Sequence, residues 1–423
     1  MTNPAHGDVL LRHARIPLAL VAEPARFGGV PLGDCLCGDL LLRAGRVVGL
    51  LPPGPRPAVA LEHDLAGRLV LPRLTEAHCH LDKTHTVARV GPVGGNLHAA
   101  IAAQRRDKIH WTWADIRARA ERGLTELFAA GCAAVRTHVD WDADELESGR
   151  TPPAWPVLTD LAAEWQDRLV LQRAALLPVE AFDGSPATEA AVQAIARAEG
   201  GVLGAFVFDQ PAKRRWLREA FALAERYDLM LDFHVDEGLS DGLDGLETVA
   251  DLVLETGFAN PVLCGHACSL INLDEAALRR TLDKVRSAGL SVVSLPTTNL
   301  YLQDRSAGAP RQRGLTRLRD LAAAGVPLAV GSDNVCDAFC PIGAHDPMAA
   351  LATAALAAHL DPPYGPWLRT VTTHARMAIG LRPVTVDQAD VTSLLVSDAA
   401  HTAELVAGAT RQPLLRYLST ATR

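Results

Sequence analysis

Short apolar runs alternate with segments of helical period along most of the chain. From about residue 70 each apolar run ends in polar residues, and stretches rich in Ala, Arg, Glu and Leu lie between most of them, as at 113–131 and 273–289. This alternation is typical of βα units with a parallel sheet. The strand-like runs number eight and cover 68–78, 131–140, 168–178, 201–209, 229–237, 261–267, 290–299 and 326–334. We therefore predict an α/β protein built on a closed (β/α)8 TIM barrel.

The two ends of the chain have a different pattern. Short, partly alternating runs separated by Gly- and Pro-rich turns indicate strands at 8–16, 38–52 and 60–72. Another strand candidate, 391–398, lies near the C-terminus and could return to the N-terminal strands. We expect a small β domain made from both ends beside the barrel. The predicted division of the chain is 1–67, 68–384 and 385–423.

Composition narrows the class of protein. A hydrophobic content of 48% with 21% charged residues is ordinary for a globular protein with a large core. The net charge of −8, without a basic run, argues against nucleic acid as a partner. The apolar stretch 16–22 is too short to span a bilayer. Eight cysteines, none paired as C-x2-C, and an N-terminus without a signal-peptide pattern predict reduced thiols in a cytoplasmic protein.

Polar side chains at the ends of the predicted strands are the candidate chemistry, because barrels of this kind place their active sites there. These residues are His78, His80, His138, Asp140, His234, Asp236, Glu237, His266, Asn299, Asp333 and Asn334. Imidazoles and a carboxylate can hold a divalent ion with an open position. Such an ion lowers the pKa of bound water from about 15.7 toward roughly 7. Glu237 would then shuttle a proton between that water and the leaving group.

Each of these residues also has a structural explanation when it is taken alone. An H-x-H pair such as His78 and His80 is common in loops, His234 could be a core histidine, and Asp333 could cap a helix. His266 and Asp333 could either bind the ion or orient the water and polarise the substrate. We interpret His138 as a supporting or structural histidine. Their order on successive strands nevertheless favours a metal-dependent hydrolase.

Eight motifs carry a resemblance to a known family: AHCHLDKT (77–84), RTHVD (136–140), HVDE (234–237), GHACS (265–269), NLYLQDR (299–305), RQRGLTR (311–317), GSDNVCDAFCPIG (331–343) and TTHARMAIGL (372–381). Together they resemble the amidohydrolase superfamily, and within it the bacterial cytosine deaminase branch, over about residues 68–400. The resemblance implies a (β/α)8 barrel flanked by a β-sandwich from both termini, in a homo-oligomer. It implies one divalent ion, Zn or Fe, and the ligands it assigns are His78, His80, His234 and Asp333.

The same resemblance assigns the catalytic roles. Glu237 would be the proton shuttle, His266 would polarise the attacking hydroxide or the substrate, and Asp333 would act beside them. Binuclear members of the superfamily bridge two metals with a carboxylated lysine or a glutamate after strand four. Here Lys213 lies beyond a proline in a cationic stretch, which argues for a single ion.

Three positions depart from the cytosine deaminase pattern. Val179 stands where the family has a glutamine that binds the pyrimidine amide edge, and Glu180 could replace it only if the loop shifts register. Asn334 and Phe339 replace a second aspartate and a tryptophan. Loss of a hydrogen-bonding partner should reduce specificity for cytosine strongly. Lys83, in the first loop, either contacts the substrate or is a solvated charge. We group Val179, Asn334, Phe339 and Lys83 as candidate substrate-binding residues.

The leading hypothesis is a metal-dependent aminohydrolase that attacks an amidine-like carbon of a small nitrogen heterocycle and releases ammonia or a small amine. Candidate substrates are cytosine, isocytosine, creatinine-like rings and amino-s-triazines. One alternative is a cyclic-amide or N-alkylamino-s-triazine hydrolase on the same scaffold. Another is a barrel without catalysis that serves as a binding or assembly subunit.

Overall fold

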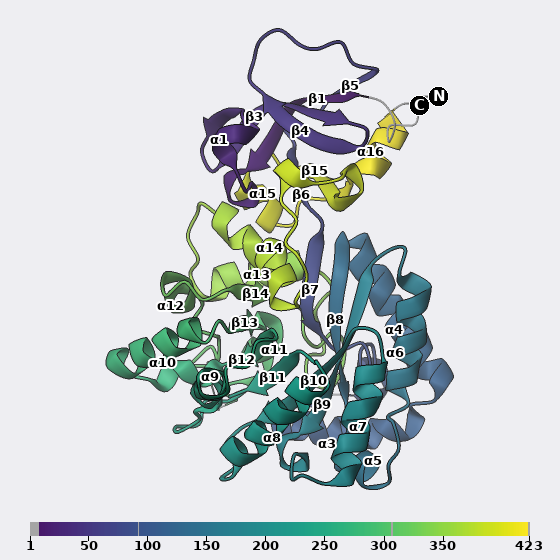
Figure 1. Ribbon diagram of the computed structural model, residues 1–423, viewed down its shortest axis with the longest axis vertical. Coiled ribbons are helices and arrows are strands. Elements are labelled where there is room, and N and C mark those ends of the chain that lie inside the picture. The colour runs from purple at the N-terminus through teal and green to yellow at the C-terminus, as the bar shows by residue number, and fades with distance from the viewer. Residues whose placement is uncertain (1–7, 92, 306–307, 422–423) are drawn as a thin grey trace.

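The barrel is an eight-stranded sheet in which every neighbouring pair of strands is parallel (Figure 1). The computed structural model describes residues 8–91, 93–305 and 308–421. In order around the sheet the strands are β7 (Leu74–Cys79), β8 (Cys132–Asp140), β9 (Val170–Pro178), β10 (Gly201–Val207), β11 (Leu231–Val235), β12 (Val262–His266), β13 (Ser291–Ser294) and β14 (Leu328–Val330). A parallel bridge between Cys79 and Asp333 brings the last strand back to the first. The predicted TIM barrel is confirmed.

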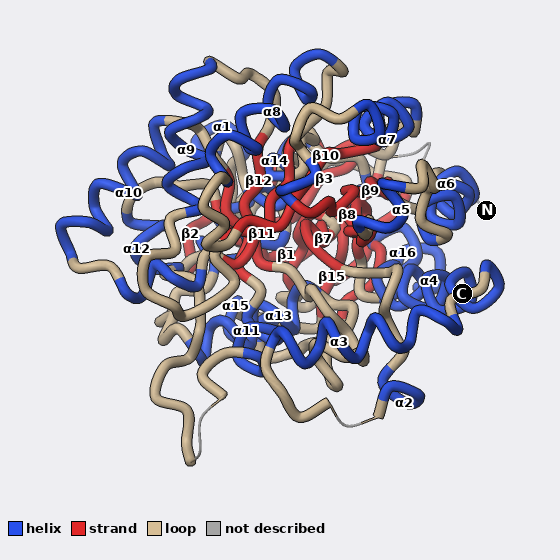
Figure 2. Tube along the Cα trace, turned by 90° about the horizontal axis from the view of Figure 1, so that it is seen from below, coloured by secondary structure: helices blue, strands red, loops and turns tan. Residues whose placement is uncertain are grey.

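Helices surround the strands, as the view along the barrel shows (Figure 2). The longer ones are α3 (Leu97–Asp107), α4 (Trp113–Ala129), α6 (Ala154–Trp165), α7 (Pro186–Arg197), α8 (Lys213–Arg226), α9 (Gly245–Thr256), α10 (Glu275–Ser287) and α13 (Pro347–Ala357). The predicted helices at 113–131 and 273–289 correspond to α4 and α10. Both begin at a side-chain cap: Thr112 accepts from the Asp115 amide at 3.2 Å, and Asp274 accepts from the Ala277 amide at 2.8 Å.

The remaining elements are short or lie near the chain ends. The helices are α1 (Pro24–Phe27), α2 (Val87–Val90), α5 (Ala143–Glu147), α11 (Pro296–Leu302), α12 (Leu318–Ala323), α14 (Thr373–Ala378), α15 (Thr402–Val406) and α16 (Leu414–Ala421). No helix in the described ranges combines the length and the apolar character needed to cross a membrane.

A second sheet joins the two ends of the chain at the top of Figure 1. Its strands are β1 (Val9–Pro17), β2 (Val30–Leu32), β3 (Cys35–Arg43), β4 (Arg46–Leu51), β5 (Leu61–Asp64), β6 (Leu69–Pro72), β15 (Leu394–Ser397) and β16 (Arg411–Pro413). The pairing of β15 with β6 is antiparallel and sets Leu395 opposite Leu71. The expected β unit from both termini is therefore present. The division at residues 67 and 384 stays a prediction.

Several predicted strands have wrong extents: the runs 38–52 and 60–72 are each two strands, and the run 326–334 is strand only over Leu328–Val330. The run 68–78 is two strands, because the chain passes at Arg73 from the terminal sheet into the barrel. The Arg73 amide donates to the Ser393 carbonyl at 2.9 Å, and its guanidinium donates to the Cys132 carbonyl at 2.5 Å, so it ties the two sheets together. The run 290–299 contains strand only to Ser294. Pro296 then begins helix α11, as proline favours the first turn of a helix, and Asn299 lies in that helix.

Candidate active site

The four residues predicted to bind a metal converge at the carboxyl ends of the barrel strands. His78 and His80 point to the same face of the chain, two residues apart, as the period of a strand requires. Their Nε2 atoms lie 3.4 and 3.2 Å from Asp333 Oδ1. His234 Nε2 lies 3.3 Å from His80 Nε2. All four side chains are buried.

Asp333 occupies an unusual backbone conformation, with φ of 57°. Its amide donates to the His78 carbonyl at 2.9 Å, so the turn after β14 is fixed against β7. His266 and Asp236, at the ends of neighbouring strands, also have left-handed φ values of 68° and 52°. Non-glycine residues in this region cost backbone energy and are concentrated at functional sites.

The donor set fits a divalent metal ion. Buried polar atoms normally have hydrogen-bond partners. Within the described residues, both carboxylate oxygens of Asp333 and Nε2 of His78 have none. Ligand atoms of His78, His234 and His266 lie within 4.8 Å of one another, as do those of His78, His80 and His138. Imidazole nitrogens with a carboxylate are the ligands that zinc and iron accept.

Burial keeps these imidazoles in the neutral form that binds metals. It lowers the pKa of His80 to about 3, with the Lys83 charge adding to the effect, and lowers the pKa of His266 to about 3. The pKa of His234 falls well below its ordinary value for the same reason. Burial raises the pKa of Asp333, but the neighbouring imidazoles of His78 and His80 outweigh it and hold that pKa well below its usual range. At neutral pH the cluster therefore offers lone pairs and one negative charge.

Glu237 and His266 face one another beside the four converging residues. Glu237 Oε2 lies 3.7 Å from His266 Nε2. Burial, with the Asp333 charge adding, raises the pKa of Glu237 well above its usual range. The Asn299 side-chain amide donates to His266 Nδ1 at 3.1 Å, so the neutral ring carries its proton on Nε2, the atom that faces Glu237. A carboxyl group of raised pKa is suited to give and take protons near neutral pH.

A buried ion-pair network contacts the histidine cluster through His138. His138 Nε2 lies 3.1 Å from Asp232 Oδ1, and Arg136 donates to Asp232 Oδ2 at 2.9 Å. Arg136 also donates to Gln172 Oε1 at 2.9 Å. The His138 ring packs 4.0 Å from that of His78, centroid to centroid. Asp232 was not among the sequence candidates, although it stands two residues before His234 and therefore on the same face of β11. The role of His138 stays a prediction.

Lys83 is buried, with only 3% of its surface exposed, so the alternative of a solvated loop charge is wrong. Its ammonium donates to both oxygens of Asp140 at 2.7 Å and lies 5.1 Å above the Phe339 ring. Burial lowers the pKa of Lys83, but the charges of Asp140 and Asp82 outweigh it and raise that pKa above its usual range. Asp82 accepts from the Asp140 amide at 3.1 Å, which completes the contact between the first loop and β8.

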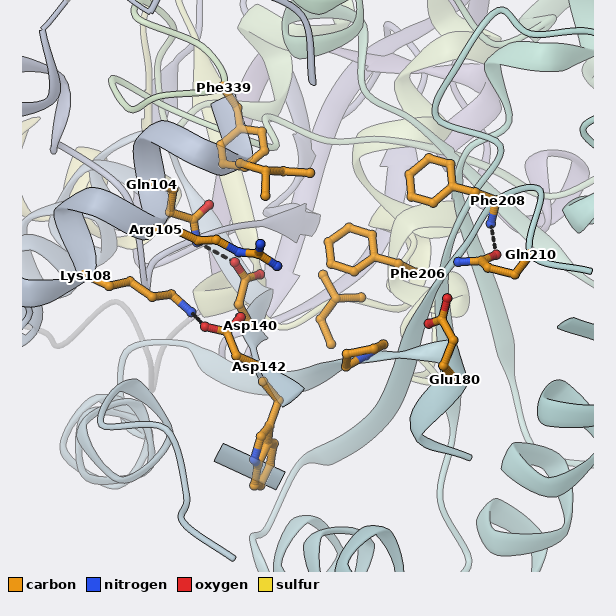
Figure 3. A pocket seen from close by; sticks show the side chains of 14 residues that line it. Gln104, Arg105, Lys108, Asp140, Asp142, Glu180, Phe206, Phe208, Gln210 and Phe339 are labelled. Atoms are coloured by element: carbon orange, nitrogen blue, oxygen red, sulfur yellow. Dashed lines mark hydrogen bonds and ion pairs between the residues drawn. The ribbon is translucent and has the colours of Figure 1, made fainter. Parts of the chain in front are cut away.

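A cavity of about 220 Å³ opens beside the histidine cluster, between α3 and the ends of β8, β9 and β10 (Figure 3). Its apolar walls include the rings of Phe206, Phe208 and Phe339, and the first two are stacked with an interplanar angle of 13°. The Phe206 ring lies 5.0 Å from that of His234, so this wall of the cavity adjoins the candidate metal centre. Its polar residues are Gln104, Arg105, Lys108, Asp140, Asp142, Glu180 and Gln210.

Not all of the candidate substrate-binding residues line the cavity. Phe339 lines the cavity. Val179 is fully buried in the main core, and it is its neighbour Glu180 that lines the wall after β9 (Figure 3). Asn334 is buried and donates to Asp337 Oδ2 at 2.7 Å. Sequence reasoning missed the residues of α3, such as Gln104, because only the tertiary contact of that helix with the strand ends brings them to the cavity.

The fold and this site define a metal-dependent hydrolase built on a (β/α)8 barrel. The chain belongs to the amidohydrolase family: the model for "Amidohydrolase family" matches residues 171–385. A pterin deaminase from Rhizobium rhizogenes is 35% identical over 382 residues, which cover 90% of this chain and 85% of that protein.

Solved structures show the same architecture. The 5-methylcytosine deaminase of Klebsiella pneumoniae, with 5-fluorocytosine bound, superposes with a TM-score of 0.77 at 24% identity and covers 96% of each chain. The N-isopropylammelide isopropylaminohydrolase of Burkholderia multivorans superposes with a TM-score of 0.68 at 24% identity, over 96% of this chain and 95% of that one. The predicted resemblance to the deaminase-like branch of the superfamily is confirmed.

Proposed function

We propose that this protein hydrolyses the exocyclic amino group of a nitrogen heterocycle and releases ammonia. One observation carries the proposal: the orphaned ligand atoms of His78 and Asp333 lie with the Glu237–His266 pair beside an aromatic-walled cavity. His78, His80, His234 and Asp333 would hold one divalent ion, zinc or iron. When bound, that ion supplies Lewis-acid activation of water at neutral pH.

The protein's own groups position the ring and move the protons. Glu237 takes the two protons of the attacking water in turn and delivers one to the ring nitrogen and the other to the departing amino group, which its raised pKa permits. His266 directs its Nε2 proton toward the reacting oxygen and is held in that tautomer by Asn299. The water oxygen bonds to the amidine carbon, the carbon–nitrogen bond breaks, and ammonia leaves.

The similarity to a pterin deaminase guides our choice of substrate. We propose a 2-amino-4-oxo pyrimidine ring fused to a second ring, stacked on Phe206 and Phe339, with Glu180 accepting from the ring amide or the amino group. Glu180 stands in the wall after β9, where Val179 was expected to act. A carboxylate that pairs with N–H groups of the ring would favour this edge over a ring that lacks them.

A panel assay tests the proposal. The metal-loaded protein should release ammonia from pterin faster than from cytosine, isocytosine, creatinine or amino-s-triazines. Glu237→Gln should lower kcat at least about 100-fold, as expected for loss of a general acid–base, while the metal content stays unchanged. Glu225→Gln, at an exposed position on α8, is the matched control. A fully active Glu237→Gln variant would refute the mechanism.

Mass analysis of the products separates the alternatives. Release of an alkylamine instead of ammonia would favour an N-alkylamino-s-triazine hydrolase, and a ring-opened product would favour a cyclic-amide hydrolase. A protein that retains no metal after loading would favour a binding or assembly subunit. Assembly into a homo-oligomer and a cytoplasmic location stay predictions, to be checked by light scattering and cell fractionation.

A further inference from the structure

A second cluster of metal-binding side chains lies outside the active site, between the first loop of the barrel and helix α4. Ligand atoms of His85, Glu126 and His345 lie within 4.8 Å of one another. His85 Nε2 is 3.1 Å from Glu126 Oε2. Three ligands of a tetrahedral zinc ion, at bonds of about 2.0–2.2 Å, are separated by roughly 3.4 Å. The observed ligand atoms, at most 4.8 Å apart, are therefore within about 1.4 Å of that separation.

The hydrogen bonds of Thr84 determine which nitrogen of His345 is free. Thr84 Oγ1 donates its single proton to the Val335 carbonyl at 2.9 Å and lies 2.9 Å from His345 Nε2. Because that proton is already used, His345 Nε2 must be the donor to Thr84. The lone pair of the neutral ring is therefore on Nδ1. Within the described residues Nδ1 has no hydrogen-bond partner, although His345 is only 2% exposed.

The surroundings of the cluster orient the ligands as outer partners do in metal sites. Arg122 donates to Glu126 Oε1 at 2.9 Å and so leaves Oε2 to face His85. Burial lowers the pKa of His345 to about 3, which keeps its ring neutral. A buried imidazole nitrogen with a lone pair and no donor is unfavourable unless something binds it. These contacts together point to an ion.

The absence of a side chain at Gly123, in α4, lets the His345 ring pack directly against that helix. A β-carbon at Gly123 would lie 3.0 Å from His345 Nε2 and 2.6 Å from Leu81 Cδ2. Glycine is unfavourable inside a helix, so its use here reflects the close approach of the imidazole. The side chain of Glu126 is 35% exposed, which gives an ion a path from solvent.

We propose that His85, Glu126 and His345 form a second, structural site for a divalent transition-metal ion of the zinc type, with water completing the coordination. Two imidazoles and one carboxylate are a ligand set that zinc accepts. The ion would tie α4 and the segment before α13 to the first loop. That loop carries Asp82 and Lys83, which hold Asp140 at the cavity wall.

Zinc alone is the probe for this site. The full-length protein is stripped with chelator, loaded with Zn²⁺, freed of excess metal by gel filtration, and its zinc and protein contents are measured. His85→Asn removes one ligand while keeping a residue that tolerates the left-handed φ of 58°. Glu126→Gln, at a partly exposed position, removes another ligand. Glu121→Gln, exposed on the same helix, is the matched control.

Both ligand variants should hold one zinc ion fewer per chain than the wild type, whereas Glu121→Gln should hold the same number. Thr84→Val, which frees the His345 ring to turn, should weaken zinc binding at this site about 10- to 100-fold. Circular dichroism of each variant confirms that it is folded. Equal zinc content in the wild type, His85→Asn and Glu126→Gln would overturn the proposal and leave a hydrogen-bonded His–Glu pair. Because the result is a difference between variants, it does not depend on an ion at the active site.

Discussion

Replacement of Asp232 by asparagine tests whether the buried network under the histidines stabilises the barrel. Arg136 and Asp232 are both fully buried, and the carboxylate also faces His138 at 3.1 Å. The variant keeps the size of the side chain but leaves the Arg136 charge without its counter-ion. Breaking a buried ion pair from one side costs about 3–5 kcal/mol.

The pKa of Asp232 gives a second measure of the same interaction. Burial raises this pKa, but the neighbouring His138 and Arg136 outweigh it and lower it from 3.8 to about 2. That change corresponds to roughly 2 kcal/mol, at about 1.4 kcal/mol per tenfold change in proton affinity. We therefore expect Asp232→Asn to lose about 2–5 kcal/mol. An unfolding entropy of about 2.1 cal/mol/K per residue over 423 residues converts this loss to a fall of roughly 2–6 °C in Tm.

Calorimetry at pH 7 measures the effect, with Asp241→Asn, in an exposed loop, as the control. Because the folded pKa is depressed, the stabilisation is present above about pH 4 and is lost as the pH falls toward 2. The Tm difference between wild type and variant should therefore shrink in acid. Adding Arg136→Met should recover part of the loss, because it removes the unpaired charge. An unchanged Tm in Asp232→Asn would refute the reasoning.

Three further outcomes are expected. Glu180→Ala should raise KM for the preferred heterocycle about 10- to 100-fold, because a hydrogen bond to a charged group contributes about 1.5–3 kcal/mol. Glu199→Ala, at an exposed position, is the control, and an unchanged KM in Glu180→Ala would remove Glu180 from the binding site. Chelation should abolish ammonia release, and Zn²⁺ or Fe²⁺ should restore it; activity that survives metal-free dialysis would exclude the proposed ion. Gly123→Ala should destabilise the protein by about 1–3 kcal/mol in urea unfolding, because the added carbon would meet Leu81 and His345. This loss is expected although alanine is the better helix former. A gain in stability would show that these neighbours can move away.

The periodic pattern of the chain determined the barrel, because buried parallel strands and amphipathic helices have separate signatures in the sequence. The pattern did not locate the change of sheet at Arg73. The strands on both sides of Arg73 are buried throughout, and apolar residues flank it directly at Leu71, Pro72 and Leu74, so the local hydrophobicity gives no sign that the chain has moved from one sheet to the other.

The candidate metal ligands could be found for a related reason. His78, His80, His234 and Asp333 each lie at or just beyond the carboxyl end of a strand, and parallel strands bring these ends to one edge. Asp232 could have been found by the same rule, since alternate residues of a strand share a face. Asn299 was found as a strand end, although it lies in α11.

Only the tertiary structure decided the contacts that depend on side-chain direction and on distant segments. Glu180 rather than Val179 lines the cavity, because the turn after β9 directs one side chain into the core and the next into the cavity. Lys83 is a buried partner of Asp140, which lies on the next strand. His85 meets His345 through the packing of α4 and the segment before α13. The sequence by itself determined the periodic elements and the order of their polar ends, since these depend on local spacing. Contacts between residues far apart in the chain depend on how the elements pack, which local spacing does not encode.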